Sequence, residues 1–202
     1  MTSVTVSGAI ALAALAAVVA SLGYLHLAPT GLSPIRNAVS QYGISPMRSG
    51  YRVATIAFAV AGVALAVGID RAVGSRASAV VVLLALFAAA RAAISWFPMD
   101  APGAPSTSTG RAHRLLATAA FGGATAAAFK LASLLADGAR WHSLAPASYA
   151  LGALMGASLG ALVLSRSYPA LRERFGLVER GFYVSAIAWF AVFGIACVAG
   201  VS

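Results

Sequence analysis

Charged residues are scarce in this sequence. Only 9% of its 202 residues are charged and 60% are apolar, whereas soluble globular domains carry about 25% charged and 45–50% apolar residues. A water-soluble domain is excluded, because too few polar side chains remain to cover its surface. Disorder is excluded as well, since disordered chains need low hydrophobicity. The length allows a single integral membrane domain, residues 1–202.

Acidic residues and cysteine are rarer still. Five Asp and Glu stand against fourteen Lys and Arg, which gives a net charge of +9. The basic residues are scattered, without the basic runs and interleaved aromatics typical of nucleic-acid binding, so we expect no nucleic-acid partner. Anionic membrane lipids are the expected partners, at about 1 kcal/mol per basic residue near the membrane surface. The single cysteine, Cys197, excludes an internal disulfide.

Long apolar runs take the place of charge. Six of them can cross a hydrocarbon core about 30 Å thick as helices of roughly 20 residues, and no alternating segments of the membrane-barrel type occur. The sequence therefore predicts an all-α fold, a polytopic membrane helix bundle with six transmembrane helices. These helices are expected near residues 8–28, 51–70, 78–97, 113–135, 145–165 and 181–201.

The predicted loops alternate in length. Those near 29–50, 98–112 and 166–180 are long, whereas those near 71–77 and 136–144 are short. Three helical hairpins would therefore present the three long loops on one face of the bundle, the long-loop face, and both termini on the other. Most arginines fall on the long-loop face, so the positive-inside rule places it in the cytoplasm.

Glycine marks one helix for close packing. Gly152, Gly156 and Gly160 recur every four residues on the fifth predicted helix, a spacing that lets another helix approach closely. The first interpretation is a tight contact inside the bundle. The alternative is a homo-oligomer that forms through the fifth helix.

Arg91 lies deep in the third predicted helix. An ionisable residue there costs at least about 2.5–3.5 kcal/mol and needs a partner or a water path. No acid is expected in mid-span to pair with it. Three interpretations remain open: a tie to Asp100, an anion or headgroup site at Arg91, or a side chain that snorkels to the surface.

The three histidines do not form a metal site in this topology. His26 and His113 are expected at the long-loop face and His142 at the opposite face. A set of ligands with a recognisable spacing, as zinc sites have, is missing. We therefore expect neither a metal nor another cofactor.

Three segments on the long-loop face form a recognisable set. Their sequences are Ser33–Gly43, Trp96–Asp100 with Gly110–His113, and Gly176–Arg180. In this order, on six predicted helices, they resemble the domain-of-unknown-function family 998 of small prokaryotic membrane proteins over nearly the whole chain. The family pattern falls on Ser40, Gly43, Pro98, Asp100, Gly110, His113 and Arg180.

The resemblance implies a multi-pass protein of a prokaryotic plasma membrane, without an established activity. Gln41 stands where the family has an acid beside Ser40. The family also tends to have basic N-termini, which implies the orientation opposite to the one from the arginine count. The orientation therefore stays open.

Three functions compete for the long-loop face. The first is binding or passage of an anionic lipid or amphiphile, because arginine holds phosphate through two parallel hydrogen bonds. The second is a membrane-embedded hydrolase or transferase, and the third an assembly subunit of a membrane complex. The ligand-binding candidates are Arg36, Arg91, Arg111, Arg180 and Tyr42, and the catalytic candidates are Asp100, His113 and Ser40.

Local structure is expected around these candidates. His113 is predicted in the first turn of the fourth helix, which Gly110 would allow the chain to enter tightly. The segment with Ile35, Val39 and Tyr42 is amphipathic and is expected to lie along the membrane interface.

Overall fold

The computed structural model describes residues 2–138 and 141–200, which fold into helices without a strand. Seven α-helices lie within these ranges: α1 (Ser3–Leu27), α2 (Arg48–Val73), α3 (Ser78–Ala93), α4 (Ser108–Ala136), α5 (Ala145–Leu164), α6 (Pro169–Arg172) and α7 (Phe175–Ala199). Four short 3-10 helices accompany them: η1 (Val39–Ile44), η2 (Gly74–Ala77), η3 (Ile94–Trp96) and η4 (His142–Leu144).

The long helices are apolar enough to cross a membrane. Within the described ranges five stretches qualify by length and composition: Ser3–Leu27, Arg48–Trp96, Ser108–Ala136, His142–Leu164 and Phe175–Ala199. The second stretch has 49 residues and contains both α2 and α3. The structure therefore indicates an integral membrane protein with five candidate spans, where the sequence predicts six.

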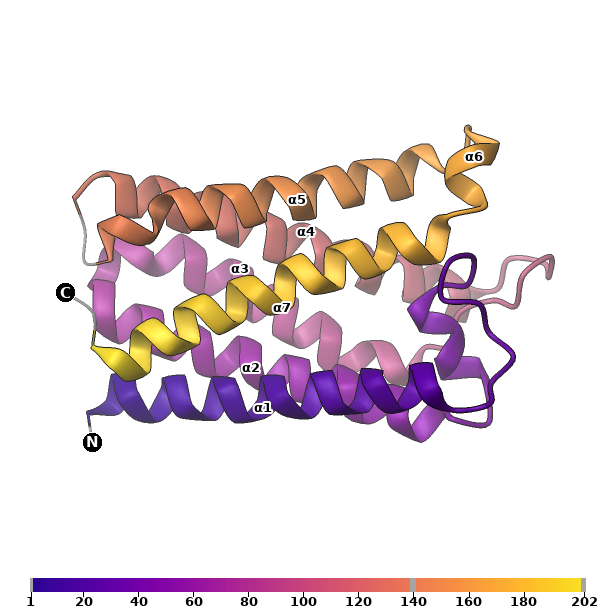
Figure 1. Ribbon diagram of the computed structural model, residues 1–202, viewed down its shortest axis with the longest axis horizontal. Helices are drawn as coiled ribbons and strands as arrows, with labels where there is room; N and C mark the ends of the chain where they lie inside the picture. Colours follow the sequence, from indigo (N-terminus) through magenta and orange to yellow (C-terminus); the bar gives the residue numbers. More distant parts are fainter. Residues whose placement is uncertain (1, 139–140, 201–202) are drawn as a thin grey trace.

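Six long helices, α1 to α5 and α7, pack in a closed ring, and α7 lies nearest its centre. Each of α1 to α5 packs against the next, and α7 follows α5 and closes the ring against α1 (Figure 1). Helix α7 also contacts α2 and α4. In the most apolar 18-residue segment of α7, 56% of the residues are buried, against 17% in that of the stretch with α5. Helix α7 is therefore central and α5 peripheral. The loops after α1, α3 and α5 lie at one end, which is the long-loop face (Figure 1).

Aromatic rings and one buried serine hold the centre together. Phe58, Phe87 and Phe190 bring α2, α3 and α7 into contact, with ring centroids 5.1 to 5.2 Å apart. Ser148 on α5 donates to the backbone oxygen of Ala128 on α4 and accepts from Nε1 of Trp189 on α7, both at 2.8 Å. A fully buried hydroxyl thus has its hydrogen bonds satisfied while it joins three helices.

The glycine stripe of α5 faces α4 only over part of its length. A Cβ at Gly152 would lie 3.2 Å from Ala128, and one at Gly156 would lie 3.7 Å from Thr125. A Cβ at Gly160 would have no atom within 4 Å. Helices α4 and α5 therefore separate toward the long-loop face.

Two helices begin earlier than their apolar pattern suggests. Thr107 caps α4, and its hydroxyl accepts from the backbone N–H of Gly110 at 3.0 Å. His113 consequently lies in the second turn of α4, where the first turn was predicted. Helix α7 begins at Phe175 and continues through Gly181, so Arg180 is helical. The first turns of α4 are polar, and Glu179 and Arg180 interrupt the apolar run of α7, so both helices extend beyond the run that was recognised.

Candidate functional site

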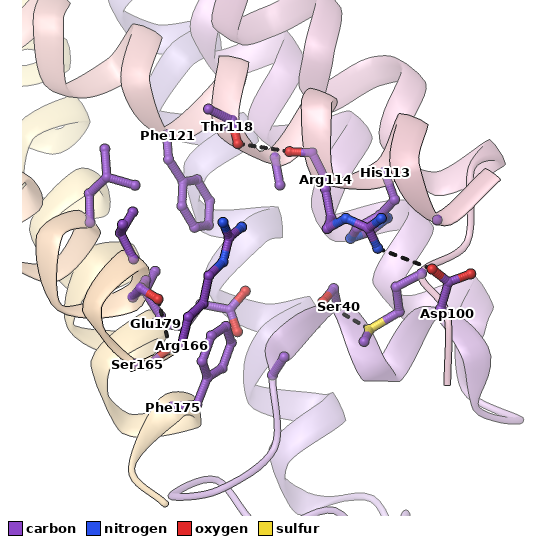
Figure 2. Close-up of a pocket in the computed structure, with 17 residues that line it drawn as sticks. Ser40, Asp100, His113, Arg114, Thr118, Phe121, Ser165, Arg166, Phe175 and Glu179 are labelled. Carbon is purple, nitrogen blue, oxygen red and sulfur yellow. Dashed lines mark hydrogen bonds and ion pairs between the residues drawn. The ribbon is translucent and has the colours of Figure 1, made fainter. Parts of the chain in front are cut away.

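A pocket of about 330 Å³ opens at the long-loop face, between α4, α5 and the start of α7 (Figure 2). We call it the α4–α5 pocket. Its apolar wall includes Ala117, Phe121, Leu159, Leu162 and Val163. Its polar lining includes Ser40, Asp100, His113, Arg114, Ser165, Arg166 and Glu179. All three catalytic candidates of the sequence, Ser40, Asp100 and His113, are thus brought to one pocket.

His113 is held in one orientation. Its Nδ1 lies 2.8 Å from the backbone oxygen of Phe97, and the residue is 5% exposed. A carbonyl oxygen only accepts, so Nδ1 carries the hydrogen and Nε2 of the neutral ring keeps its lone pair. His113 therefore presents a hydrogen-bond acceptor to the pocket.

Asp100 organises the loop before α4. Its Oδ1 accepts from the backbone N–H and the hydroxyl of Thr107 at 3.2 and 2.6 Å, and its Oδ2 accepts from Nη1 of Arg114 at 3.1 Å. The hydroxyl of Thr107 is the main cause that lowers the pKa of Asp100 below its ordinary value. A Cβ at Gly110 would overlap this carboxylate, so the carboxylate needs glycine there.

The tie between Arg91 and Asp100, one of three interpretations that the sequence leaves open, is not formed. Arg91 is 2% exposed and donates from Nη1 to the hydroxyl of Tyr183 at 3.0 Å, with its guanidinium over the Tyr183 and Phe58 rings at 5.4 and 5.7 Å. The burial also excludes snorkelling. Asp100 instead lies beyond the helix end, where the nearer Arg114 binds it.

Glu179 is the acid that the sequence reasoning missed. It is 6% exposed, lines the α4–α5 pocket and accepts from the backbone N–H of Val39 at 2.6 Å. The signal was present, because Glu179 precedes Arg180 in the third of the recognisable segments, but the residue was assigned to a loop.

Arg180 connects helix α7 with the loop that follows α1. Its Nε donates to Nε2 of His26 at 2.6 Å, and its Nη1 donates to the backbone oxygens of Asn37 and Gly176 at 2.8 and 3.0 Å. Its Nη2 lies 3.5 Å from the hydroxyl of Tyr42. The guanidinium is therefore occupied by groups of the protein itself.

The segment around η1 folds into the bundle instead of along the membrane interface. Val39 and Tyr42 are each 1% exposed, while Ile35 is 53% exposed. The carboxylate of Glu179 and the guanidinium of Arg180 draw this segment inward, since they bind Val39 and Asn37.

Two other predicted ligand-binding arginines lie elsewhere. Arg36 and Arg111 are exposed and do not line the α4–α5 pocket. Arg114 and Arg166 line it in their place. Arg114 faces the pocket because α4 already runs as a helix from Ser108, which fixes the face on which each side chain lies.

No group of three His, Cys, Asp or Glu that could hold a metal ion occurs among residues 2–138 and 141–200. The polar lining of the α4–α5 pocket consists of hydrogen-bond donors, one imidazole acceptor and carboxylates, and it lies next to an apolar wall.

Comparison with known proteins gives one match. A family model described as "Protein of unknown function (DUF998)" matches residues 11–196, which confirms the resemblance seen in the sequence. No curated protein and no solved structure matches the chain.

Proposed function

This chain belongs to the DUF998 family, and we propose that it binds an amphiphile with an anionic headgroup in the α4–α5 pocket. One observation carries the proposal: a pocket of about 330 Å³ joins an apolar wall to a polar lining that includes two arginines. Small-molecule pockets typically measure about 300–1,000 Å³ and are mostly apolar, with a few polar groups that fix the ligand's orientation.

Arg166 is the residue best placed for the headgroup. It is exposed, and its guanidinium makes no hydrogen bond or ion pair within the described part of the chain. Arg114 adds positive charge, although Asp100 already occupies one of its donors. A planar guanidinium can give two parallel hydrogen bonds to a phosphate or carboxylate. The headgroup is therefore assigned to Arg166 and Arg114, in place of Arg36, Arg111 and Arg180.

The apolar part of the ligand fits along α5. Leu159, Leu162 and Val163 line the pocket where α4 and α5 have separated. Val163 is 56% exposed, so this wall continues onto the outer surface of the bundle. In a membrane that surface faces lipid, which gives an acyl chain a direct way into the pocket.

The same proposal includes six membrane spans. Helix α2 has 26 residues and rises about 39 Å, and α3 with η3 rises about 30 Å. Each matches or exceeds a hydrocarbon core about 30 Å thick, so α2 and α3 cross separately, with η2 as the turn. The α4–α5 pocket then lies at the membrane surface, and the family resemblance implies the plasma membrane of a prokaryote.

Lipid retention tests the proposal. The detergent-purified protein is mixed with anionic and zwitterionic lipids, and native mass spectrometry counts the lipids that stay bound. We expect Arg166→Ala to weaken retention of the anionic lipid about tenfold or more, as loss of a charge-assisted pair does. Leu159→Trp, which fills the pocket, should abolish it.

Two matched variants control for surface effects. Arg174→Ala removes an exposed arginine of the long-loop face that does not line the α4–α5 pocket, and Leu154→Trp places the same bulk on the exposed side of α5. Both should retain lipid as the unchanged protein does. Equal losses in all four variants would show that only diffuse membrane electrostatics holds the lipid.

A second candidate is acid–base chemistry on the bound amphiphile. It is favoured by the fixed orientation of His113, whose Nε2 can accept a proton in the pocket that Glu179 also lines. Asp100 serves the loop in this version, since Thr107 and Arg114 occupy its carboxylate. Conversion of the retained lipid that stops in His113→Gln would establish this chemistry, and an unconverted lipid would leave binding alone.

A further inference from the structure

We infer that a second cavity, at the start of α2, binds the phosphate of an anionic phospholipid headgroup. This α2 cavity measures about 570 Å³ and shares no lining residue with the α4–α5 pocket. Ser45, Arg48, Arg52, Ser95 and Trp96 contribute to its lining. It is formed where the end of η1, the first turns of α2 and η3 meet.

Positive charge in this cavity has no counter-charge from the protein. Arg48 and Arg52 lie one turn apart on α2, and no acid lines the cavity. Within the described ranges, the one ion pair closer than 4.0 Å joins Arg114 to Asp100. The Arg48 side chain makes no hydrogen bond there, and the Arg52 guanidinium rests over the Trp96 ring at 5.0 Å.

The N-terminus of α2 also favours an anion in the α2 cavity. Its N-cap residue, Met47, makes no side-chain capping bond, and its first turn contains no acid. Cations at a helix N-terminus are electrostatically unfavourable, since that end already carries partial positive charge. An anion in the cavity would compensate the two arginines and the partial positive charge of the helix end together.

The hydroxyl of Ser95 supports a ligand in the α2 cavity for a reason that does not depend on charge. Ser95 lines the cavity, and its Oγ is buried and has no hydrogen-bond partner within the described residues. A buried hydroxyl without a partner is costly. A phosphate oxygen would accept its proton, and the two guanidinium groups would supply the remaining donors.

The cavity lies where phospholipid headgroups lie. Trp96 and Ile44 line it and are 56% and 40% exposed, and tryptophan is enriched at the membrane–water interface. An aromatic ring and an aliphatic side chain beside two arginines suit a headgroup that continues into acyl chains. A soluble phosphate ester shares the phosphate chemistry but has no use for this apolar rim.

Trp96 makes the proposal measurable. Trp141 and Trp189 are 0% exposed, so quenching from the lipid reports mainly on Trp96, and Trp96→Phe gives the background. The protein is placed in nanodiscs of phosphatidylcholine with increasing fractions of phosphatidylglycerol brominated in its acyl chains. We expect saturable quenching at low fractions, and Arg48→Gln should require a several-fold higher fraction for half-quenching.

Two further variants decide between a site and a charged surface. Ser95→Ala removes the buried hydroxyl without changing the net charge, and it should also raise the half-quenching fraction. Arg174→Gln removes an exposed arginine that lines neither cavity and should not. Equal shifts in Arg48→Gln and Arg174→Gln, or none in Ser95→Ala, would overturn the proposal.

A titration without lipid identifies the source of the phosphate. Glycerol 3-phosphate is added to the protein in a non-ionic detergent, and the Trp96 emission is followed. A response that needs near-molar concentrations supports the phospholipid. A saturable response at micromolar concentration that disappears in Arg48→Gln would overturn the lipid assignment in favour of a soluble phosphate ester.

Discussion

The arginines of this protein differ in what their donors already bind. The side-chain donors of Arg180 are hydrogen-bonded to His26, Asn37, Gly176 and Tyr42. Arg166 has none of its side-chain donors occupied within the described residues. Both look alike in the sequence, as single arginines at the end of an apolar run. Which of them is free for a ligand depends on acceptors that the fold brings from other elements, such as the imidazole of His26.

Asp100 leads to a prediction about acid stability. The hydrogen bond from the Thr107 hydroxyl lowers its pKa in the folded protein, so the ionised carboxylate is favoured by folding. This stabilisation is complete above the pKa of the unfolded chain, about 3.9, and is lost as the pH falls through the lower folded pKa. We expect Asp100→Asn to lower the thermal unfolding midpoint near neutral pH and to flatten its decline below about pH 4.

The measurement is the unfolding midpoint in detergent between about pH 2.5 and pH 7. Asp137→Asn serves as control, because Asp137 lies at the other end of α4 and makes no ion pair within the described part of the chain. It should keep the acid decline of the unchanged protein. A decline in Asp100→Asn as steep as in the unchanged protein would contradict the prediction.

The structure groups some of the residues selected from the sequence and adds others. Ser40, Asp100 and His113 were selected from motifs, and the fold brings all three to the α4–α5 pocket. Glu179 was missed because Glu179 and Arg180 interrupt the apolar run, whose start was placed at Gly181, while the helix itself begins at Phe175. An apolar run stops at the first charged or polar residues and omits the helical turns beyond them, where site residues of this protein lie.

At the scale of elements, the glycine stripe of α5 shows what spacing leaves open. Three glycines four residues apart predict close packing along one face. The structure has α4 against Gly152 and Gly156, while Gly160 meets nothing within 4 Å. Whether two helices stay together or diverge depends on their crossing geometry and on side chains of the partner helix. The spacing alone contains neither.

Substitutions at the two ends of the stripe should have opposite outcomes. Gly152→Leu should destabilise the protein by about 1–3 kcal/mol, the usual cost of overpacking, because its side chain would collide with Ala128 and Phe129. Gly160→Leu should be tolerated, since that position is open. Thermal unfolding of both variants in the same detergent checks this. A Gly160→Leu protein as unstable as Gly152→Leu would mean that another chain packs on the stripe.

For the molecule as a whole, composition was the strongest signal. The scarcity of charge predicted a membrane-embedded all-α chain, and the structure has helices without strands in its described ranges, five stretches of them of membrane-spanning length. The family followed from short motifs and is confirmed over residues 11–196. The ring order, with α7 between α5 and α1, was beyond the sequence, because it depends on contacts such as Gly8 against Gly194 that join residues far apart in the chain.

Six spans would place η2 and the long-loop face on opposite sides of the membrane. Ser75 lies in η2 and Ser106 in the loop before α4, at opposite ends of the bundle, and both are exposed. Single cysteines at these positions, in a Cys197→Ala background, are labelled in intact cells with a membrane-impermeant maleimide and again after permeabilisation. If α2 and α3 cross separately, one cysteine reacts in intact cells and the other only after permeabilisation. Which of them reacts first also fixes the orientation, on which the arginine count and the basic N-termini of the family disagree. Equal labelling of both in intact cells would place η2 and the long-loop face on the same side of the membrane, and α2 with α3 would then not be two spans.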